Sequence, residues 1–390
     1  MTSLLLLAAA FDVVALVDHY DFARYFDIET RKGVLQTLDH VVNTHPTDVW
    51  WRDKGGGRAR YPSKVEAWPL QEYPFDRHIV PNEIDYGHLR LDRPETDSLS
   101  AVLPACQRKG IRFGIHTTFE ECHESIPSAS CWTMDHPQYW TRMKGRRPWG
   151  GSTSLAFPEV AAHRLAMLDE RLAFRPEAVF LDLHRNGTYH VPPVAREYVK
   201  PVVEKWRLRH GCEPPADYFD PRWTALVSEH MMDYLRRYGE KCHAAGARFV
   251  LGFQMLDTST VDGGLWRRFA IDWPELASEG VVDGIVVLAV KYDKNDIWGS
   301  LGRVYREVMA RRGKADVYFN LAVYDWQSDL GFKGVAKHAK ISDVESARRL
   351  LALARDVGAR GVVLECVDFN KYSPEVCAEM QKFRGTTARP

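Results

Sequence analysis

The chain has few of the features that direct a protein to a membrane, a nucleic acid or a redox site. Its opening apolar stretch, residues 4–10, is well short of the ~20 residues that a membrane-spanning helix needs. The 52 basic residues balance 52 acidic residues, so no net charge favours nucleic acid or an anionic membrane. The seven cysteines are scattered and none has the C-x-x-C spacing of zinc or redox sites. The sequence therefore predicts neither a nucleic-acid partner nor a membrane partner.

Motifs for cofactors and metals are also missing. Gly55-Gly56-Gly57 follows an apolar run but lacks the Lys-Ser/Thr and the following helix of a phosphate-binding loop. No HExxH spacing occurs, so no metal and no cofactor is expected. Residues 1–10 resemble the apolar part of a signal peptide but lack its basic start. They are interpreted as an apolar N-terminal segment that resembles the remnant of a signal, and localisation and oligomeric state stay open.

What the chain does contain is a series of short apolar runs that end in polar or aromatic residues. Runs rich in Val, Ile, Phe and Leu, too short for helices, are typical of strands buried on both faces of a parallel sheet. Eight such runs lie at residues 12–17, 48–51, 111–117, 178–183, 248–255, 283–290, 317–323 and 361–366. The pattern predicts an α/β fold: a single (β/α)8 TIM barrel over residues 11–387.

Helical segments are expected between these runs. Asp220-Pro221 has the cap and first-turn residues of a helix start, and the stretch that follows ends at Gly246. Three times a helical segment is followed by a glycine, a basic residue two positions later and then an apolar run. The glycines are Gly110, Gly246 and Gly358. This order is expected where a helix leads into the next strand. The connections after strands 2 and 3, residues 54–97 and 121–151, are long and are expected to shape a site above the barrel.

The carboxyl ends of the strands meet at one rim of such a barrel, so the polar residues there should share a cleft. Asp182 is the strongest candidate because it ends an apolar strand, Ala178–Leu181, where a buried carboxylate needs a compensating partner. Alternation places His184 on the same side as Asp182. A histidine there can orient the acid, accept a proton or bind sugar hydroxyls.

These residues carry a resemblance to a known group of proteins. The stretch from Ser154-Leu155-Ala156-Phe157-Pro158-Glu159-Val160 to Phe180-Leu181-Asp182-Leu183-His184-Arg185 resembles the glycosyl-hydrolase-like TIM-barrel families, which include the family 10-like group. Those families typically show a Pro-Glu-Val segment, a helix and a strand that ends in Asp-x-x-Arg. Arg60-Tyr61-Pro62-Ser63-Lys64-Val65 is similar to their early part. The resemblance implies a carbohydrate-active barrel with Asp182 as its likeliest catalytic carboxylate.

Glycoside hydrolysis commonly needs two carboxyl groups, one to protonate the leaving oxygen and one to attack or to activate water. The candidates for the second group are Asp293, Glu365, Glu120 and Asp18. The resemblance favours Asp293, since related barrels often place the second acid after strand six. The local sequence favours Glu365, which follows the buried run Val362–Leu364, where burial favours a protonated acid. Both remain candidates.

Aromatic and polar side chains at the rim would hold a sugar, whose apolar face stacks on an aromatic ring. Of Trp50 and Trp51, only one can face the barrel axis, and we expect this to be Trp51, with Arg52 close by. The full set of expected substrate-binding residues is Asp18, His19, Trp51, Arg52, His116, Glu120, His184, Arg185, Tyr292 and Tyr324.

Two other functions fit the same residues. Asp18, His19, His116, Asp182 and His184 offer the carboxylate and imidazole ligands of a metal-dependent hydrolase. A barrel that binds a glycan without cleaving it would need only one of the acids to be absent. A glycoside hydrolase acting by paired carboxylates is nevertheless the main prediction.

Overall fold

The computed structural model describes the barrel strands, most helices and parts of the loops. The described residues are 11–18, 22, 25–28, 30–55, 58–66, 97–119, 130–146, 148–183, 192–256, 266, 268–290, 295–321, 323–325, 337–339, 344–365 and 373–387. The N-terminal segment, residues 1–10, lies outside them.

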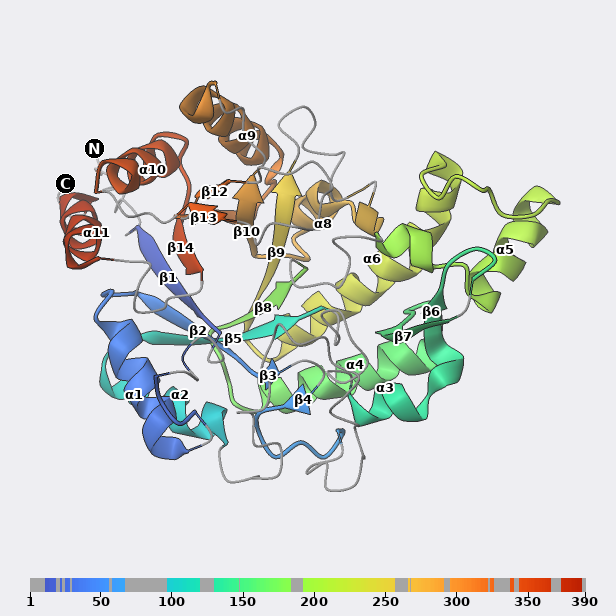
Figure 1. The fold of residues 1–390 in the computed structure, drawn as a ribbon, viewed down its shortest axis with the longest axis horizontal. Coiled ribbons are helices and arrows are strands. Elements are labelled where there is room, and N and C mark those ends of the chain that lie inside the picture. Colours follow the sequence, from blue (N-terminus) through green and yellow to red (C-terminus); the bar gives the residue numbers. More distant parts are fainter. Residues whose placement is uncertain are drawn as a thin grey trace, which may run out of the picture.

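Eight parallel strands close into a barrel in the spatial order β1-β14-β11-β10-β9-β8-β5-β2, which confirms the predicted (β/α)8 fold. The strands lie at the centre of the molecule with helices around them (Figure 1). Their bounds are β1 Asp12–Val17, β2 Asp48–Arg52, β5 Arg112–Thr118, β8 Ala178–Asp182, β9 Arg248–Leu256, β10 Gly284–Val290, β11 Asp316–Asn320 and β14 Gly361–Glu365.

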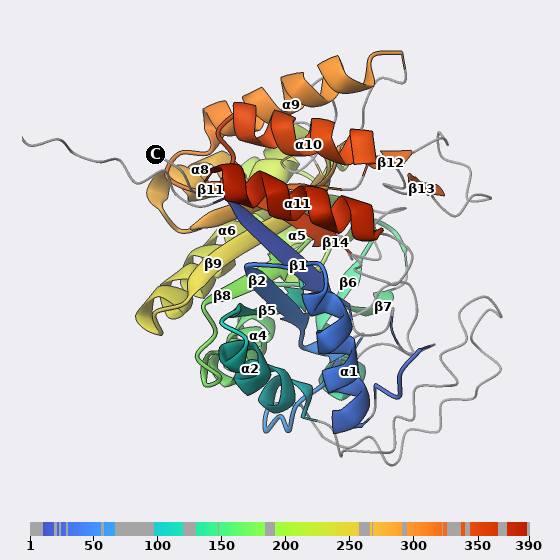
Figure 2. The same cartoon turned by 90° about the vertical axis from the view of Figure 1, so that its left-hand side faces the viewer.

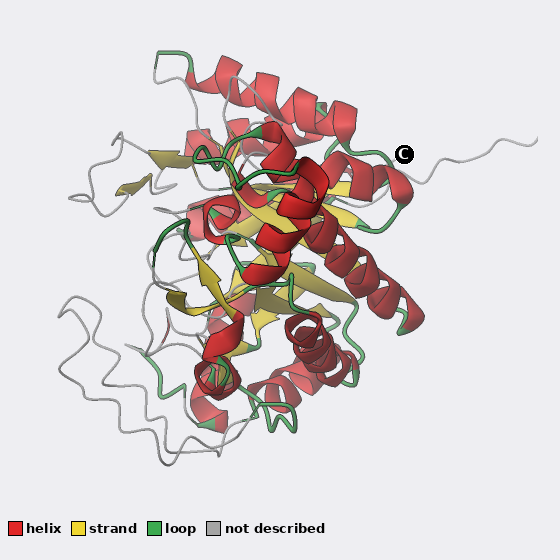
Figure 3. Cartoon of the chain, turned by 90° about the vertical axis from the view of Figure 1, so that its right-hand side faces the viewer, coloured by secondary structure: helices red, strands yellow, loops and turns green. Residues whose placement is uncertain are grey.

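The helices cover the outer face of the barrel. They are α1 Arg31–Val42, α2 Ser98–Arg108, α3 Cys131–Asp135, α4 Pro158–Leu172, α5 Lys200–His210, α6 Pro221–Ala244, α8 Trp273–Glu279, α9 Ile297–Arg311, α10 Val344–Asp356 and α11 Pro374–Thr387. Figure 2 shows α10 and α11 side by side, near the first and last strands. Figure 3 shows the helices on several sides of the central strands. In the described part of the chain, no helix is long and apolar enough to cross a membrane.

The predicted helix signals act as expected. The Asp220 side chain accepts a hydrogen bond from the Arg222 backbone N–H at 2.9 Å, and Pro221 is the first residue of α6. Helix α6 is followed by Gly246 at φ +76°, a left-handed conformation that glycine adopts without the strain a Cβ would bring. Gly110 and Gly358 also adopt a left-handed backbone conformation, with φ of +65° and +79°. The repeated helix, glycine and strand pattern therefore marks the lower turns of the barrel.

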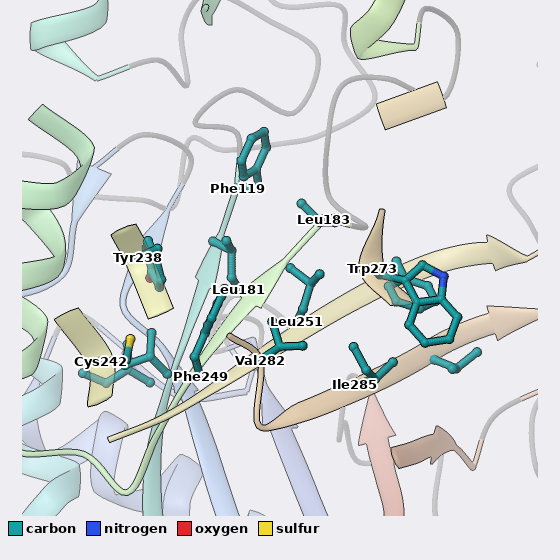
Figure 4. Close-up of a cluster of buried hydrophobic side chains, with 14 of the residues drawn as sticks. Phe119, Leu181, Leu183, Tyr238, Cys242, Phe249, Leu251, Trp273, Val282 and Ile285 are labelled. Atoms are coloured by element: carbon teal, nitrogen blue, oxygen red, sulfur yellow. The ribbon is translucent and has the colours of Figure 1, made fainter. Parts of the chain in front are cut away.

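Alternation along the strands divides the core into two layers. The inward faces of seven strands, all except β5, fill the barrel with a cluster made of Val14, Leu16, Trp50, Ala178, Phe180, Val250, Val286, Leu288, Tyr318 and Val363. The other face packs against the helices in a much larger cluster. Figure 4 shows part of this outer cluster, in which Leu181 and Phe249 of the strands lie near Tyr238 and Cys242 of α6, and Leu251 lies near Val282.

Some elements differ from the prediction. The seventh barrel strand ends at Asn320, not at residue 323, and Val323–Asp325 (β12) instead pairs with Lys337–Ala339 (β13) in an antiparallel ribbon. The connection after the third barrel strand contains α3 and a ribbon of Trp140–Arg142 (β6) with Pro148–Thr153 (β7). A shorter ribbon, Lys54–Gly55 (β3) with Arg58–Ala59 (β4), follows the second barrel strand. Helices α5 and α8 were not predicted. The apolar pattern of strand seven continues past its last barrel pairing, so the pattern alone could not locate its end.

Candidate active site

Among the described side chains, six barrel strands carry a polar group in the inward-facing row near the C-terminal end of the strand. Five of these groups lie two residues beyond a residue of the inner cluster, as Asp182 does beyond Phe180 and Glu365 beyond Val363. His116 lies two residues beyond Gly114, where a Cβ atom would meet Trp50. All six are buried, with exposed fractions between 2% and 5%. They are Asp18 after β1, Arg52 of β2, His116 of β5, Asp182 of β8, Asn320 of β11 and Glu365 of β14. The structure thus brings six polar groups to the C-terminal end of the barrel interior.

Asp182 is held by His116 from the neighbouring strand. The distance from His116 Nε2 to Asp182 Oδ2 is 3.0 Å. His116 Nδ1 is buried without a hydrogen-bond partner, so a proton on Nδ1 would have no acceptor. The contact fixes the Asp182 carboxyl of β8 against the imidazole of β5.

Glu365 is oriented by Asn320, a residue that the sequence analysis did not single out. The Asn320 amide nitrogen donates to Glu365 Oε2 at 2.8 Å and to the Leu288 carbonyl oxygen at 2.7 Å. These two bonds use both hydrogens of the amide. Because the Leu288 carbonyl belongs to β10, the amide fixes the Glu365 carboxyl relative to two neighbouring strands. The sequence pattern did not show that β11 ends at Asn320, so it gave no reason to place this amide at the rim.

The third pair joins the first two strands of the chain. The Arg52 guanidinium donates to Asp18 Oδ2 in a buried ion pair. A buried charge needs such a partner because transfer from water to the interior is costly for an isolated ion. Arg52 thus compensates the charge of Asp18 and links β2 to β1, which makes Asp18 less suited than Asp182 to direct chemistry.

Asp182 and Glu365 approach the barrel axis from opposite sides, because β8 and β14 lie four places apart in the closed ring of eight strands. Aromatic rings lie one layer below them. The ring centroids of Trp50 and Phe180 are 5.3 Å apart, and those of His116 and Phe180 are 5.0 Å apart. Burial raises the pKa of Tyr318, in the same layer, to about 12. The layer beneath the polar pairs is therefore uncharged.

The choice of Trp51 as the inward-facing tryptophan was wrong. Trp51 belongs to the outer cluster, between the strands and the helices, whereas Trp50 lies in the inner cluster. The reason is the alternation of β2: Arg52 points inward to Asp18, so Trp50 shares that side and Trp51 faces the helices. Both indoles are buried below the rim, at 1% and 0% exposure, so Trp51 is not placed to stack on a sugar.

Several predicted site residues lie outside the described part of the chain. They are His19, Glu120, His184, Arg185, Tyr292 and Asp293. The backbone of Tyr324 is described as part of the β12–β13 ribbon, opposite His338. The described candidates that meet at the rim are Asp18, Arg52, His116, Asp182 and Glu365. Among the residues that can be placed, no three His, Cys, Asp or Glu side chains gather in a way suited to a metal ion.

Several solved structures have a fold similar to that of this chain. The PgaB (BpsB) glycoside hydrolase domain from Bordetella bronchiseptica matches with a TM-score of 0.57 at 12% identity, covering 97% of this chain and 98% of that chain. The C-terminal domain of a putative chitinase from Desulfitobacterium hafniense DCB-2 matches at 0.52 and 10% identity, covering 97% and 100%. A β-galactosidase from the psychrophilic Marinomonas ef1 matches at 0.52 and 13% identity, covering 97% and 59%.

The fold of this chain is thus similar to that of glycoside hydrolase TIM-barrel domains, as the resemblance in the sequence implied. No protein-family model and no curated protein matches the sequence. At 10–13% identity the likeness establishes the fold, and activity has to be argued from the side chains at the rim.

Proposed function

We propose that this chain is a glycoside hydrolase whose catalytic acids are Asp182 and Glu365, carried by a single barrel domain over residues 11–387. The observation that carries the proposal is the burial of these two carboxyl groups at the inward-facing ends of opposite strands, each in contact with a side chain of a neighbouring strand, His116 or Asn320. A pair of carboxyl groups that flanks the scissile bond is what most glycoside hydrolases use.

The hydrogen bonds suggest different roles for the two acids. His116 Nε2 lies 3.0 Å from Asp182 Oδ2, and a histidine that donates there supports a carboxylate that acts as the nucleophile or as the base that activates water. Asn320 donates to Oε2 of Glu365, and a carboxyl held through that oxygen can present a proton from Oε1 to the leaving oxygen. His116 and Asn320 are then positioning residues, because each acts through the acid it contacts.

The substrate would be a carbohydrate that enters from the C-terminal side of the barrel. Asp18 and Arg52 are proposed to contact its hydroxyls beside the two acids. His19, Glu120, His184, Arg185, Tyr292 and Tyr324 stay proposed substrate contacts from the connections above the strands. Asp293 stays the alternative second acid, and a variant of it belongs in the same test.

The test begins with a screen of the purified protein against aryl glycosides and a glycan array. Replacement of Asp182 by Asn keeps the shape and removes the charge, so we expect kcat to fall by roughly 10²–10⁴-fold with glycan binding retained. Glu365→Gln should lose activity on sugars with poor leaving groups but keep much of it on a dinitrophenyl glycoside, whose leaving group needs no proton. If Asp293 is the acid, Asp293→Asn rather than Glu365→Gln should keep activity on the dinitrophenyl glycoside and lose it on sugars with poor leaving groups.

The matched control is Asp316→Asn at the other end of the barrel. Asp316 is the first residue of β11 and pairs with Arg248, with 40% of its side chain exposed. This variant should keep the rate of the original protein. Full activity in the Asp182→Asn variant would contradict the proposal. Activity that chelation abolishes and zinc restores would replace it with the metal-dependent hydrolase, and binding without any cleavage would indicate a glycan-binding barrel.

A further inference from the structure

The register of the barrel strands places Asp182 and Glu365 at the same level, although they lie on opposite sides of the ring. Residues that pair on neighbouring strands lie side by side, so a line of such partners can be followed around the barrel. From Glu365 through β1, β2 and β5 to β8, the successive partners are Leu16, Trp50, Gly114 and Ala178. This line reaches β8 four residues before Asp182.

The other half of the circuit gives the same offset. From Asp182 through β9, β10 and β11 to β14, the successive partners are Gly252, Val286, Tyr318 and Gly361. This line reaches β14 four residues before Glu365. The full circuit is thus displaced by eight residues, which is the shear of a TIM barrel. Because the displacement is equal on the two halves, the two acids lie in one layer and face each other across the axis.

The side-chain contacts of the two acids keep them on opposite sides. His116 of β5 holds Asp182 at 3.0 Å, and Asn320 of β11 holds Glu365 at 2.8 Å. In the order of the ring, β5 follows β8 in the same direction in which β11 follows β14. Both carboxyl groups are therefore drawn the same way around the ring, and neither is drawn toward the other.

The width of the barrel then sets the separation of the two carboxyl groups. Eight strands about 4.8 Å apart and tilted by about 36° place opposite backbones roughly 15 Å apart. With C–C bonds of about 1.5 Å, an aspartate and an extended glutamate together span roughly 6 Å of that width up to their carboxyl carbons. The carboxyl carbons are then roughly 9 Å apart, and the nearest oxygens roughly 7 Å, even when both side chains point straight at the axis.

This separation decides between the two ways in which paired carboxyl groups hydrolyse a glycosidic bond. Enzymes that retain the anomeric configuration use groups about 5–5.5 Å apart, because one of them bonds to the sugar. Enzymes that invert the configuration use groups about 6.5–9.5 Å apart, which leaves room for a water molecule. The separation across this barrel lies in the second range.

We propose that this protein hydrolyses glycosides with inversion of the anomeric configuration, with Asp182 as the base and Glu365 as the acid. Asp182 removes a proton from the water whose oxygen bonds to the anomeric carbon. As the bond from that carbon to the leaving oxygen breaks, Glu365 donates its proton to the leaving oxygen. Asp182 ends protonated and Glu365 ionised, and proton exchange with solvent restores both.

This inference rests on the proposed function and defines its reaction more closely. The sugar is never bonded to the protein, so no glycosyl-enzyme forms that could pass the sugar to an alcohol. Water is therefore the acceptor, and the reaction is hydrolysis without glycosyl transfer.

The anomer that forms first tests the inference. An aryl glycoside that the screen shows to be cleaved is hydrolysed in deuterium oxide at high enzyme concentration and followed by proton NMR before the free sugar mutarotates. We expect the first free sugar to have the configuration opposite to that of the glycoside. Asp316→Asn, at the other end of the barrel, should give the same anomer. Asp182→Asn should be too slow to give an early excess of either anomer.

Methanol added to the same reaction gives a second measurement. An enzyme with a covalent intermediate passes part of its sugar to methanol, whereas we expect no methyl glycoside here. A retained first anomer, or methyl glycoside among the products, overturns the inference and leaves the glycosidase function in place. A crystal structure with the two carboxyl groups about 5 Å apart overturns it without any assay. If no glycoside is cleaved, the proposed function itself fails, and this inference fails with it.

Discussion

Two glycines make room for the aromatic rings that fill the barrel below the candidate site, and this packing gives a sharp prediction. A Cβ atom at Gly252 would lie 2.2 and 2.4 Å from Cε2 and Cζ of Phe180. Ordinary contact begins at 3.4 Å, so the Phe180 ring would have to move by about 1 Å. Trp50 and His116 flank that ring, with centroids at 5.3 and 5.0 Å, and oppose the movement.

We therefore expect Gly252→Ala to destabilise the protein by about 3 kcal/mol, the upper end of what overpacking a core usually costs. For a chain of 390 residues this corresponds to a fall of roughly 4 °C in the unfolding midpoint, which calorimetry can measure. The double variant with Phe180→Leu should lose less stability than the sum of the two single variants, because the smaller side chain leaves space for the added methyl group.

Gly302→Ala is the matched control, with the same chemical change and the opposite expected sign. Gly302 lies inside α9, where an added Cβ would meet Arg306 Nη1 at 3.4 Å and Leu353 Cδ1 at 3.5 Å, both ordinary contacts. Alanine in a helix interior is favoured over glycine by roughly 0.5–1 kcal/mol, so this variant should be slightly more stable. If Gly252→Ala matched Gly302→Ala in stability, or if its effect simply added to that of Phe180→Leu, the inferred packing of the barrel interior would be refuted.

Two further predictions concern charged residues away from the rim. Asp53→Asn removes the partner of the fully buried Arg171, and we expect a loss of about 3–5 kcal/mol in thermal or denaturant unfolding; a loss below about 1 kcal/mol would count against the ion pair. The hydrogen bond from the Arg222 side chain lowers the pKa of Asp220 to about 2, below the ordinary value of 3.8, so its contribution to stability is present above about pH 4 and is lost as the pH falls toward 2. Asp220→Asn keeps the helix cap but should lose less stability than the original protein between pH 4 and pH 2, and an unchanged acid response would contradict this assignment.

The barrel could be predicted from the sequence because its strands are short apolar runs separated by capped helices. Residues 361–366 and 178–183 were expected as strands and match β14 and β8 to within a residue. Polar residues at strand ends could be assigned to one rim for the same reason. Helix α8 has only seven residues, and propensity over so short a stretch is weak beside tertiary packing. Helix α5 has 11 residues, but only Val202 and Trp206 are buried, so its sequence has no clear apolar face.

The partners within the site were harder to predict because they depend on register between strands that are distant in sequence. Asn320 was missed for this reason. The apolar pattern continues to Val323, whereas β11 ends where its pairing with β14 ends, at Asn320 beside Val363. Because the strand ends there, the Asn320 amide lies two residues beyond Tyr318, and its nitrogen is 2.8 Å from Glu365 Oε2.

The correct tryptophan could have been predicted from the alternation of side chains along β2. Trp51 and Arg52 are consecutive, so both cannot point to the axis of the barrel. Once Arg52 is taken to reach the rim, Trp50 must lie beneath it, and the ion pair of Arg52 with Asp18 is consistent with that choice. Consistent alternation along each strand would have selected the correct indole without coordinates.

The same alternation accounts for the chemical character of the site. Inward positions at the strand ends carry Asp182, His116 and Glu365, and the inward positions one layer below carry Trp50 and Phe180. Gly114 and Gly252 admit these rings: a Cβ atom at Gly114 would lie 2.4 Å from Trp50 Cδ1. The rings keep water out from below, and electrostatic interactions between the polar groups above are stronger in such a medium than in water. In the described part of the chain, these rings close the barrel below the two acids, so the packing that Gly252→Ala disturbs is the floor of the proposed catalytic site.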